Sequence, residues 1–141
     1  MSANIENRLT VAAVTRGVTK IWAVRDSADA HPTVILKEPD DQRQNHYRQV
    51  SRNDLKGVER VDREYFEEIA QALKPAKEIL LVGHGTGKAN EMKKLREYLQ
   101  AHHADIARKV VGEENTHLES MTDPEVVVLA RKWFDNPIHA H

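Results

Sequence analysis

The sequence predicts a single α/β domain built on a mixed five-stranded sheet with flanking helices. Its 141 residues are the length of one domain. The first part of the chain carries a pair of strand patterns joined by a tight turn, and the second part alternates strand and helix patterns without an internal repeat. An antiparallel hairpin followed by a parallel βαβ half gives one mixed sheet with helices packed on it.

Three strands are expected in the first part of the chain, at residues 9–15, 18–24 and 33–38. The turn at Arg16-Gly17 joins the first two strands as a hairpin. Residues 39–60 contain few apolar side chains and are predicted to be a polar connecting loop. The ends of the chain, residues 1–8 and 136–141, are predicted to be flexible.

A helix is expected from Asp62, which can cap it, to Leu73, with Pro75 ending it. Its apolar residues recur at helical spacing and form the inner face: Tyr65, Phe66, Ile69, Ala70 and Leu73. The continuous apolar run from Ile79 to Val82 is typical of a strand buried on both faces.

The rest of the chain predicts two more helices and a brief strand. Met92, Leu95 and Leu99 indicate a helix ending near His102-His103, then a short turn carries Ile106, and Val110-Val111 suggests the last strand. Thr122 and Glu125 match a capping box for a final helix that Asn136-Pro137 ends. We expect the core to include Val11, Val14, Ile21, Phe66, Ile69, Leu80, Val82, Leu95, Leu99, Leu129 and Trp133.

Composition limits the class of protein. The chain has no cysteine, which excludes disulfides and thiolate metal sites. It shows neither a signal peptide nor an apolar run long enough for a membrane span, so a cytoplasmic location without a membrane partner is expected. The net charge of −1 argues against strong non-specific nucleic-acid binding by the whole molecule.

A glycine-rich turn joins the Ile79 strand to the next helix and is the candidate site for an anion. Backbone N–H groups at such a turn commonly bind anions at the carboxyl end of a sheet. Neither the P-loop pattern nor the dinucleotide-binding pattern fits its glycine spacing, so a simple tight connection is the favoured interpretation. The anion-binding candidates are Gly83, His84, Gly85, Thr86, Gly87 and Lys88.

The hairpin Val-Ala-Ala-Val-Thr-Arg-Gly-Val-Thr-Lys-Ile-Trp-Ala-Val resembles the start of the middle domain of archaeal and eukaryotic peptide-chain release factors and of Pelota. Tyr65-Phe66, the Ile79 strand and the glycine turn look like later features of that family. The stretches from Ile106 and from Thr122 look like small bacterial single-domain relatives, often labelled translational-machinery proteins. The resemblance spans roughly residues 9–135. It implies a ribonuclease-H-like fold and a link to the ribosome.

The resemblance carries over no catalytic residue. Release factors hydrolyse peptidyl-tRNA through a Gly-Gly-Gln loop, which should correspond to residues 39–60. That segment contains Gln42, Gln44, Gln49 and Gly57 but no Gly-Gly pair. Pelota-like relatives also lack the tripeptide and act by binding. We therefore expect a non-catalytic translation-associated protein that needs no cofactor.

The same segment is the best candidate surface for RNA or a ribosome. Four of its cations recur at a spacing of four residues and would form one stripe if the segment were helical, with an aromatic side chain available for stacking. Gly57 opposes a continuous helix, so a solvated loop is the simpler interpretation. The RNA-binding candidates are Arg43, Tyr47, Arg48, Arg52, Lys56 and Arg60.

Two alternative functions remain at this stage. A metal-dependent nuclease needs clustered carboxylates, but the first strand carries none, and Glu64, Glu67 and Glu68 look like a solvated helix face. A small-anion-binding or nucleotide-binding module would use the glycine turn. No metal site is expected, because adjacent His102 and His103 would point in different directions and the other histidines are scattered.

A homodimer is a further open question. Trp133 and Phe134 are neighbours on the last helix and cannot both point into the core. One of them is therefore expected to be partly exposed or buried against another subunit.

Overall fold

A five-stranded sheet in the order β3-β2-β1-β4-β5 forms the centre of this single α/β domain, as the sequence predicts. The computed structural model describes residues 5–25, 31–37, 54–84, 91–136 and 138, and only the backbone of 54–61. The strands are β1 Leu9–Val14, β2 Val18–Ala23, β3 Thr33–Leu36, β4 Glu78–Gly83 and β5 Val110–Asn115.

The sheet joins an antiparallel half to a parallel half at β1. β2 runs antiparallel to both β1 and β3, whereas β4 runs parallel to both β1 and β5. The predicted hairpin turn is present, because the Thr15 hydroxyl donates to the Val18 carbonyl at 2.7 Å and accepts the Val18 N–H at 3.2 Å. β1 is the central strand of the sheet, with β2 antiparallel on one side and β4 parallel on the other.

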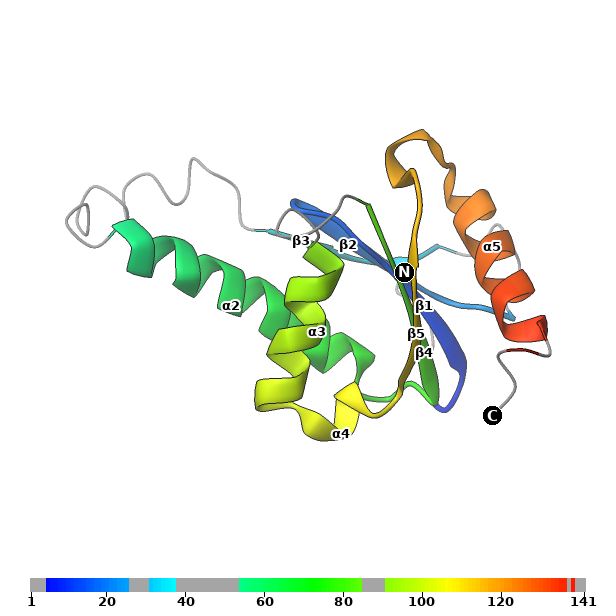
Figure 1. Ribbon diagram of the computed structural model, residues 1–141, viewed down its shortest axis with the longest axis horizontal. Helices are drawn as coiled ribbons and strands as arrows, with labels where there is room; N and C mark the ends of the chain where they lie inside the picture. The colour runs from blue at the N-terminus through cyan, green and yellow to red at the C-terminus, as the bar shows by residue number, and fades with distance from the viewer. Residues whose placement is uncertain (1–4, 26–30, 38–53, 85–90, 137, 139–141) are drawn as a thin grey trace.

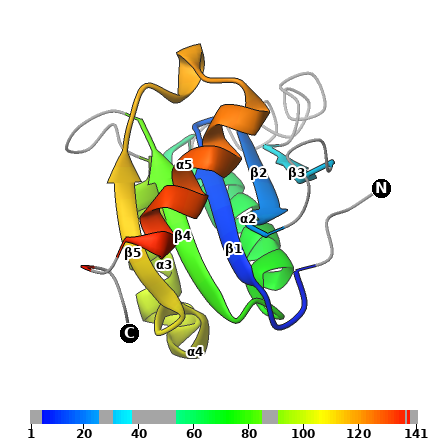
Figure 2. The same cartoon turned by 90° about the vertical axis from the view of Figure 1, so that its right-hand side faces the viewer.

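Helices cover both faces of the sheet (Figures 1 and 2). On one face lie α2 and α3, with the short α4 following α3, and α5 is the one described helix on the other face. Their bounds are α2 Asp54–Leu73, α3 Glu91–His102, α4 Ala104–Ala107 and α5 Asp123–Asp135, with a 3₁₀ turn η3 at Leu118–Ser120. None of the described helices is long and apolar enough to span a membrane.

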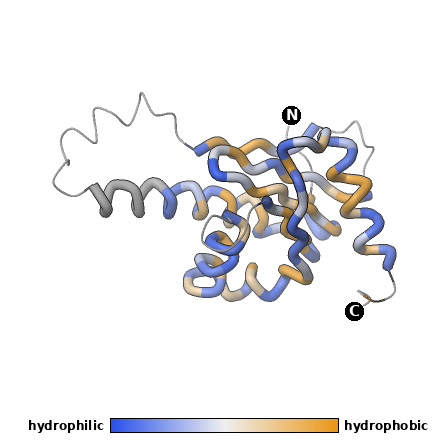
Figure 3. Tube along the Cα trace, turned by 45° about the horizontal axis from the view of Figure 1, so that its top comes forward, coloured by the Kyte–Doolittle hydropathy of each residue, from blue (hydrophilic) through white to orange (hydrophobic). Residues whose placement is uncertain are grey.

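Two apolar cores lie on the two faces of the sheet. Successive residues of a strand point to opposite faces, so Leu81 packs under α2 and α3 while Leu80 and Val82 pack under α5. In Figure 3 the hydrophobic colour is concentrated in the strands. All the predicted core residues are buried except Leu129, which is partly buried against the α5 core.

The predicted start of the first helix was wrong. α2 begins at Asp54 rather than Asp62, so the last part of the expected 39–60 loop is helical. Asp62 does not cap the helix, and its carboxylate instead pairs with Lys37 at 2.6 Å. Apolar residues continue at helical spacing through Leu55 and Val58, and this pattern outweighs the cost of Gly57, about 1 kcal/mol.

Other element ends differ less from the prediction. β5 extends through Asn115, because its polar second half pairs with β4 through the backbone. Ile106 lies in the helix α4 rather than in a simple turn. The capping box of α5 is confirmed: the Thr122 hydroxyl accepts the Glu125 N–H at 3.3 Å, and Glu125 Oε1 accepts the Thr122 N–H at 2.7 Å.

Trp133 fixes the contact between α5 and β5. Its indole lies over Gly112, so closely that an added Cβ at this glycine would lie 2.1 Å from Cζ2. Phe134 packs against the indole edge-on, with ring centroids 5.1 Å apart. Trp133 is buried and Phe134 only partly buried, in agreement with the expectation for neighbouring residues.

Gly112→Ala should destabilise the fold by about 1–3 kcal/mol, because the new methyl group would displace the Trp133 ring. Urea unfolding measures the change. Gly17→Ala is the matched control: nothing lies within 4 Å of its added Cβ, so its stability should stay within about 1 kcal/mol of wild type. Equal effects at the two glycines would contradict the proposed Trp133 contact.

Candidate functional site

The carboxyl ends of the parallel strands meet at one edge of the sheet. The Thr116 N–H after β5 donates to the Gly83 carbonyl at 2.9 Å, and His84 Nδ1 lies 3.0 Å from the Thr116 carbonyl. Because a carbonyl only accepts, Nδ1 carries the hydrogen of this bond. The His84 and His117 rings lie 5.6 Å apart. The turns after β4 and β5 are therefore tied together.

This edge contains the start of the predicted anion site. Gly83 ends β4 and His84 follows it, whereas Gly85, Thr86, Gly87 and Lys88 lie outside the described residues. The described residues next to the turn, Tyr65 and Glu91 among them, are therefore the ones on which the anion-binding hypothesis can be judged.

Tyr65 of α2 lies beneath this edge and holds the β1–β2 turn. Its hydroxyl donates to the Thr15 carbonyl at 2.9 Å, so the Thr19 hydroxyl, 2.8 Å away, must donate to Tyr65. Burial raises the pKa of Tyr65 to about 12, and the negative charges of Glu91 and Glu68 add to this effect against the Thr19 hydrogen bond. At neutral pH this phenol is a structural donor rather than a base.

Glu91 places a buried negative charge at the start of α3. Its residue is 4% exposed, and Oε1 accepts a hydrogen bond from Lys94 at 3.2 Å. Oε2 is buried and has no hydrogen-bond partner among the residues that the structure describes. A carboxylate in the first turn of a helix interacts favourably with the helix dipole. It also repels any second anion there, which weakens the case for phosphate at this end of α3.

A second polar cluster joins α2 to the end of α3. Glu67 Oε1 lies 2.7 Å from both Tyr98 Oη and His103 Nε2, and Glu67 Oε2 lies 2.8 Å from Gln71 Nε2. Hydrogen bonds from His103, Tyr98 and Gln71 lower the pKa of Glu67 to about 2. The carboxylate is therefore ionised at neutral pH, and all three partners donate to it.

This cluster bears on two of the predictions. α3 ends at His102, and the rings of His102 and His103 both lie beside Tyr98, at 4.6 and 6.0 Å between centroids. Glu67 is not simply part of a solvated face. Its partners lie 31 and 36 residues away in the sequence, and local spacing carries no signal of such contacts.

No group of three or more histidine or acidic side chains within the described part of the chain could hold a metal ion. β1, where a nuclease would need a carboxylate, has the sequence Leu-Thr-Val-Ala-Ala-Val. The described side chains at the carboxyl edge are thus hydrogen-bonding and structural in character.

The predicted RNA-binding residues lie at and before the start of α2. Arg43, Tyr47, Arg48 and Arg52 fall outside the described residues. Lys56 and Arg60 lie in the first turns of α2, four residues apart and hence one helical turn apart. In Figure 1 the beginning of α2 projects beyond the sheet and α3. The helical backbone thus places these two sequence positions one turn apart on the same side of α2.

Comparisons of the chain with protein-family models, with curated proteins and with solved structures gave no match.

Tyr65→Phe should lower the free energy of unfolding by about 1–3 kcal/mol, since it leaves the Thr15 carbonyl without its donor. Tyr98→Phe is the matched control on a more exposed contact and should cost less than about 1 kcal/mol. Urea denaturation of both variants provides the comparison. A larger loss of unfolding free energy in Tyr98→Phe than in Tyr65→Phe would contradict the structural role given to the Tyr65 hydroxyl.

The Glu67 cluster should make stability depend on acid pH. The pKa of Glu67 is about 2 in the folded chain and 4.5 ordinarily, so the ionised form stabilises the fold. This contribution is complete above about pH 5 and is lost as the pH falls toward 2. The side chain is 41% exposed, so we expect less than about 1 kcal/mol.

Glu67→Gln should therefore flatten the stability profile between pH 5 and pH 2, as followed by thermal melting. Glu64→Gln removes a charge from the same helix without touching the Tyr98 and His103 contacts. An unchanged slope in Glu67→Gln would refute the role of this carboxylate.

Proposed function

We propose that this chain is a non-catalytic, translation-associated protein of the cytoplasm that binds RNA or the ribosome through the start of α2 and the basic segment before it. The observation that carries the proposal is the helical backbone at Lys56 and Arg60. In sequence these two continue the series Arg48 and Arg52 at the same four-residue interval.

Two further points support a translational role. The sequence resembles the middle domain of release factors and Pelota in the order of its motifs, and the hairpin followed by a βαβ half is the arrangement that this ribonuclease-H-like resemblance implies. The chain lacks a Gly-Gly-Gln tripeptide. Binding without peptidyl-tRNA hydrolysis is therefore the activity that fits.

Electrostatics favour a local binding surface. The net charge of −1 gives the whole molecule no general attraction for nucleic acid. Cations in the first turns of a helix add to the positive potential of its unpaired N–H groups. Within residues 54–60, Asp54 and Glu59 offset the charge of Lys56 and Arg60, so the local excess of positive charge lies in residues 42–53, just before the helix.

The two rival functions have less support. A nuclease would need carboxylates that β1 lacks. An anion-binding module at the glycine turn would place a second negative charge near the buried Glu91 carboxylate. The binding protein requires neither arrangement.

Co-sedimentation with ribosomes over a salt series tests the proposal. Wild type should pellet with ribosomes at low salt and dissociate as salt rises, because phosphate contacts release counterions. Replacing Arg48, Arg52 and Lys56 with alanine should weaken binding and reduce the slope of the log–log salt plot by about one per lost phosphate contact.

The matched control replaces Lys74, Lys93 and Arg108 with alanine, which removes the same charge elsewhere. It should bind like wild type. Absence of co-sedimentation even at low salt, or equal weakening by both triple variants, would contradict the proposal. A peptidyl-tRNA hydrolysis assay should give no product, and activity would show that the loop has been misinterpreted.

A further inference from the structure

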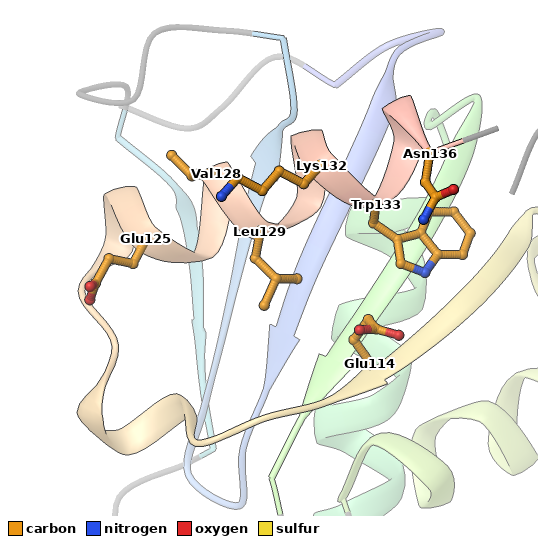
Figure 4. A pocket seen from close by; sticks show the side chains of 7 residues that line it. All are labelled: Glu114, Glu125, Val128, Leu129, Lys132, Trp133 and Asn136. Carbon is orange, nitrogen blue, oxygen red and sulfur yellow. The ribbon is translucent and has the colours of Figure 1, made fainter. Parts of the chain in front are cut away.

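A groove of about 430 Å³ runs between α5 and the β5 side of the sheet (Figure 4). Trp133 and Glu114 lie at one end, Leu129 points toward the sheet, and Glu125 lies at the other end. The complete lining is Glu114, Glu125, Val128, Leu129, Lys132, Trp133 and Asn136. Six of these residues come from α5 or its C-cap, so one flank of that helix forms most of the surface.

The opposite flank of α5 holds the helix on the sheet. Lys20 of β2 pairs with Asp123 at 3.1 Å, and Arg131 Nε donates to the Val24 carbonyl at 2.8 Å. Arg25 pairs with Asp135 at 2.6 Å. These contacts tie α5 toward β2, whereas the structure describes no ion pair for Glu125 or Lys132 on the groove side.

The groove flank has a symmetric pattern of charge. Glu125, Val128, Leu129 and Lys132 recur at intervals of three and four, so they lie along one side of the helix. Val128 is 40% exposed, one of the few large apolar side chains so exposed among the described residues. An apolar centre is thus flanked by an acid one turn before it and a base one turn after it.

We propose that this groove is a homodimer interface in which α5 of a second copy packs antiparallel against α5. The two-fold axis passes beside Val128 and Leu129. Because Glu125 and Lys132 lie at equal spacing on either side of this point, Glu125 faces the partner's Lys132, and Lys132 faces the partner's Glu125. A parallel arrangement would oppose like charges, so the charge pattern selects the antiparallel one.

The interface differs from the one that the sequence suggests. Phe134 does not line the groove, and it packs on Trp133 instead. Trp133 is the buried wall of the groove, held over Gly112, and the exposed apolar contact is Val128. The dimer contact is therefore one turn closer to the start of α5 than the aromatic pair.

Charge exchange tests this geometry by sedimentation velocity over a concentration series. Wild type should dimerise, and Lys132→Glu and Glu125→Lys should each weaken the dimer about thirtyfold, because each variant opposes like charges at both symmetric contacts. A mixture of the two variants should form heterodimers, since every facing pair is then of opposite charge. The double variant Glu125→Lys with Lys132→Glu should dimerise again.

Glu97→Lys and Arg108→Glu are the matched controls, because both residues are exposed and lie outside the groove. Separately they should dimerise like wild type. Glu125→Lys also loses its bond to the Thr122 N–H, so circular dichroism checks that each variant is folded. A monomeric wild type at high micromolar concentration, or a mixture of groove variants that does not associate, would overturn the proposal.

Discussion

The parallel pairing of β1 with β4 is the constraint on which the rest of the structure depends. Ile79, Leu80, Leu81 and Val82 are fully buried, so both faces of this pair must be covered. Among the described helices, α2 and α3 cover one face, and α5 covers the other. This requirement explains why Gly112 has no side chain: the Trp133 indole occupies the space where its Cβ would lie.

The carboxyl edge of the sheet is occupied by structural hydrogen bonds of Tyr65 and His84 and by the buried Glu91 carboxylate. We propose that recognition lies instead at two peripheral surfaces. The backbone at the start of α2 projects beyond the sheet and α3, and the groove flank of α5 presents an apolar centre between opposite charges. The proposed partner of the first is RNA or the ribosome, and that of the second is another copy of the chain.

The sequence predicts the sheet and most of the core because buried strands appear as apolar runs and helices as periodic ones. The start of α2 was missed because Gly57 and surrounding charges obscured the spacing of Leu55 and Val58, although that spacing was a usable signal. The Glu67 cluster was not predictable, since its contacts join side chains far apart in sequence. The groove likewise depends on which side of α5 the sheet contacts, and helical periodicity alone does not define that side.

Hydrogen–deuterium exchange with and without ribosomes tests most directly the claim that recognition lies at the start of α2. The account predicts slower amide exchange in residues 54–60 when ribosomes are present, with β1 and β4 already protected and unchanged. Unchanged exchange in 54–60, together with new protection confined to the carboxyl edge of the sheet, would contradict the claim.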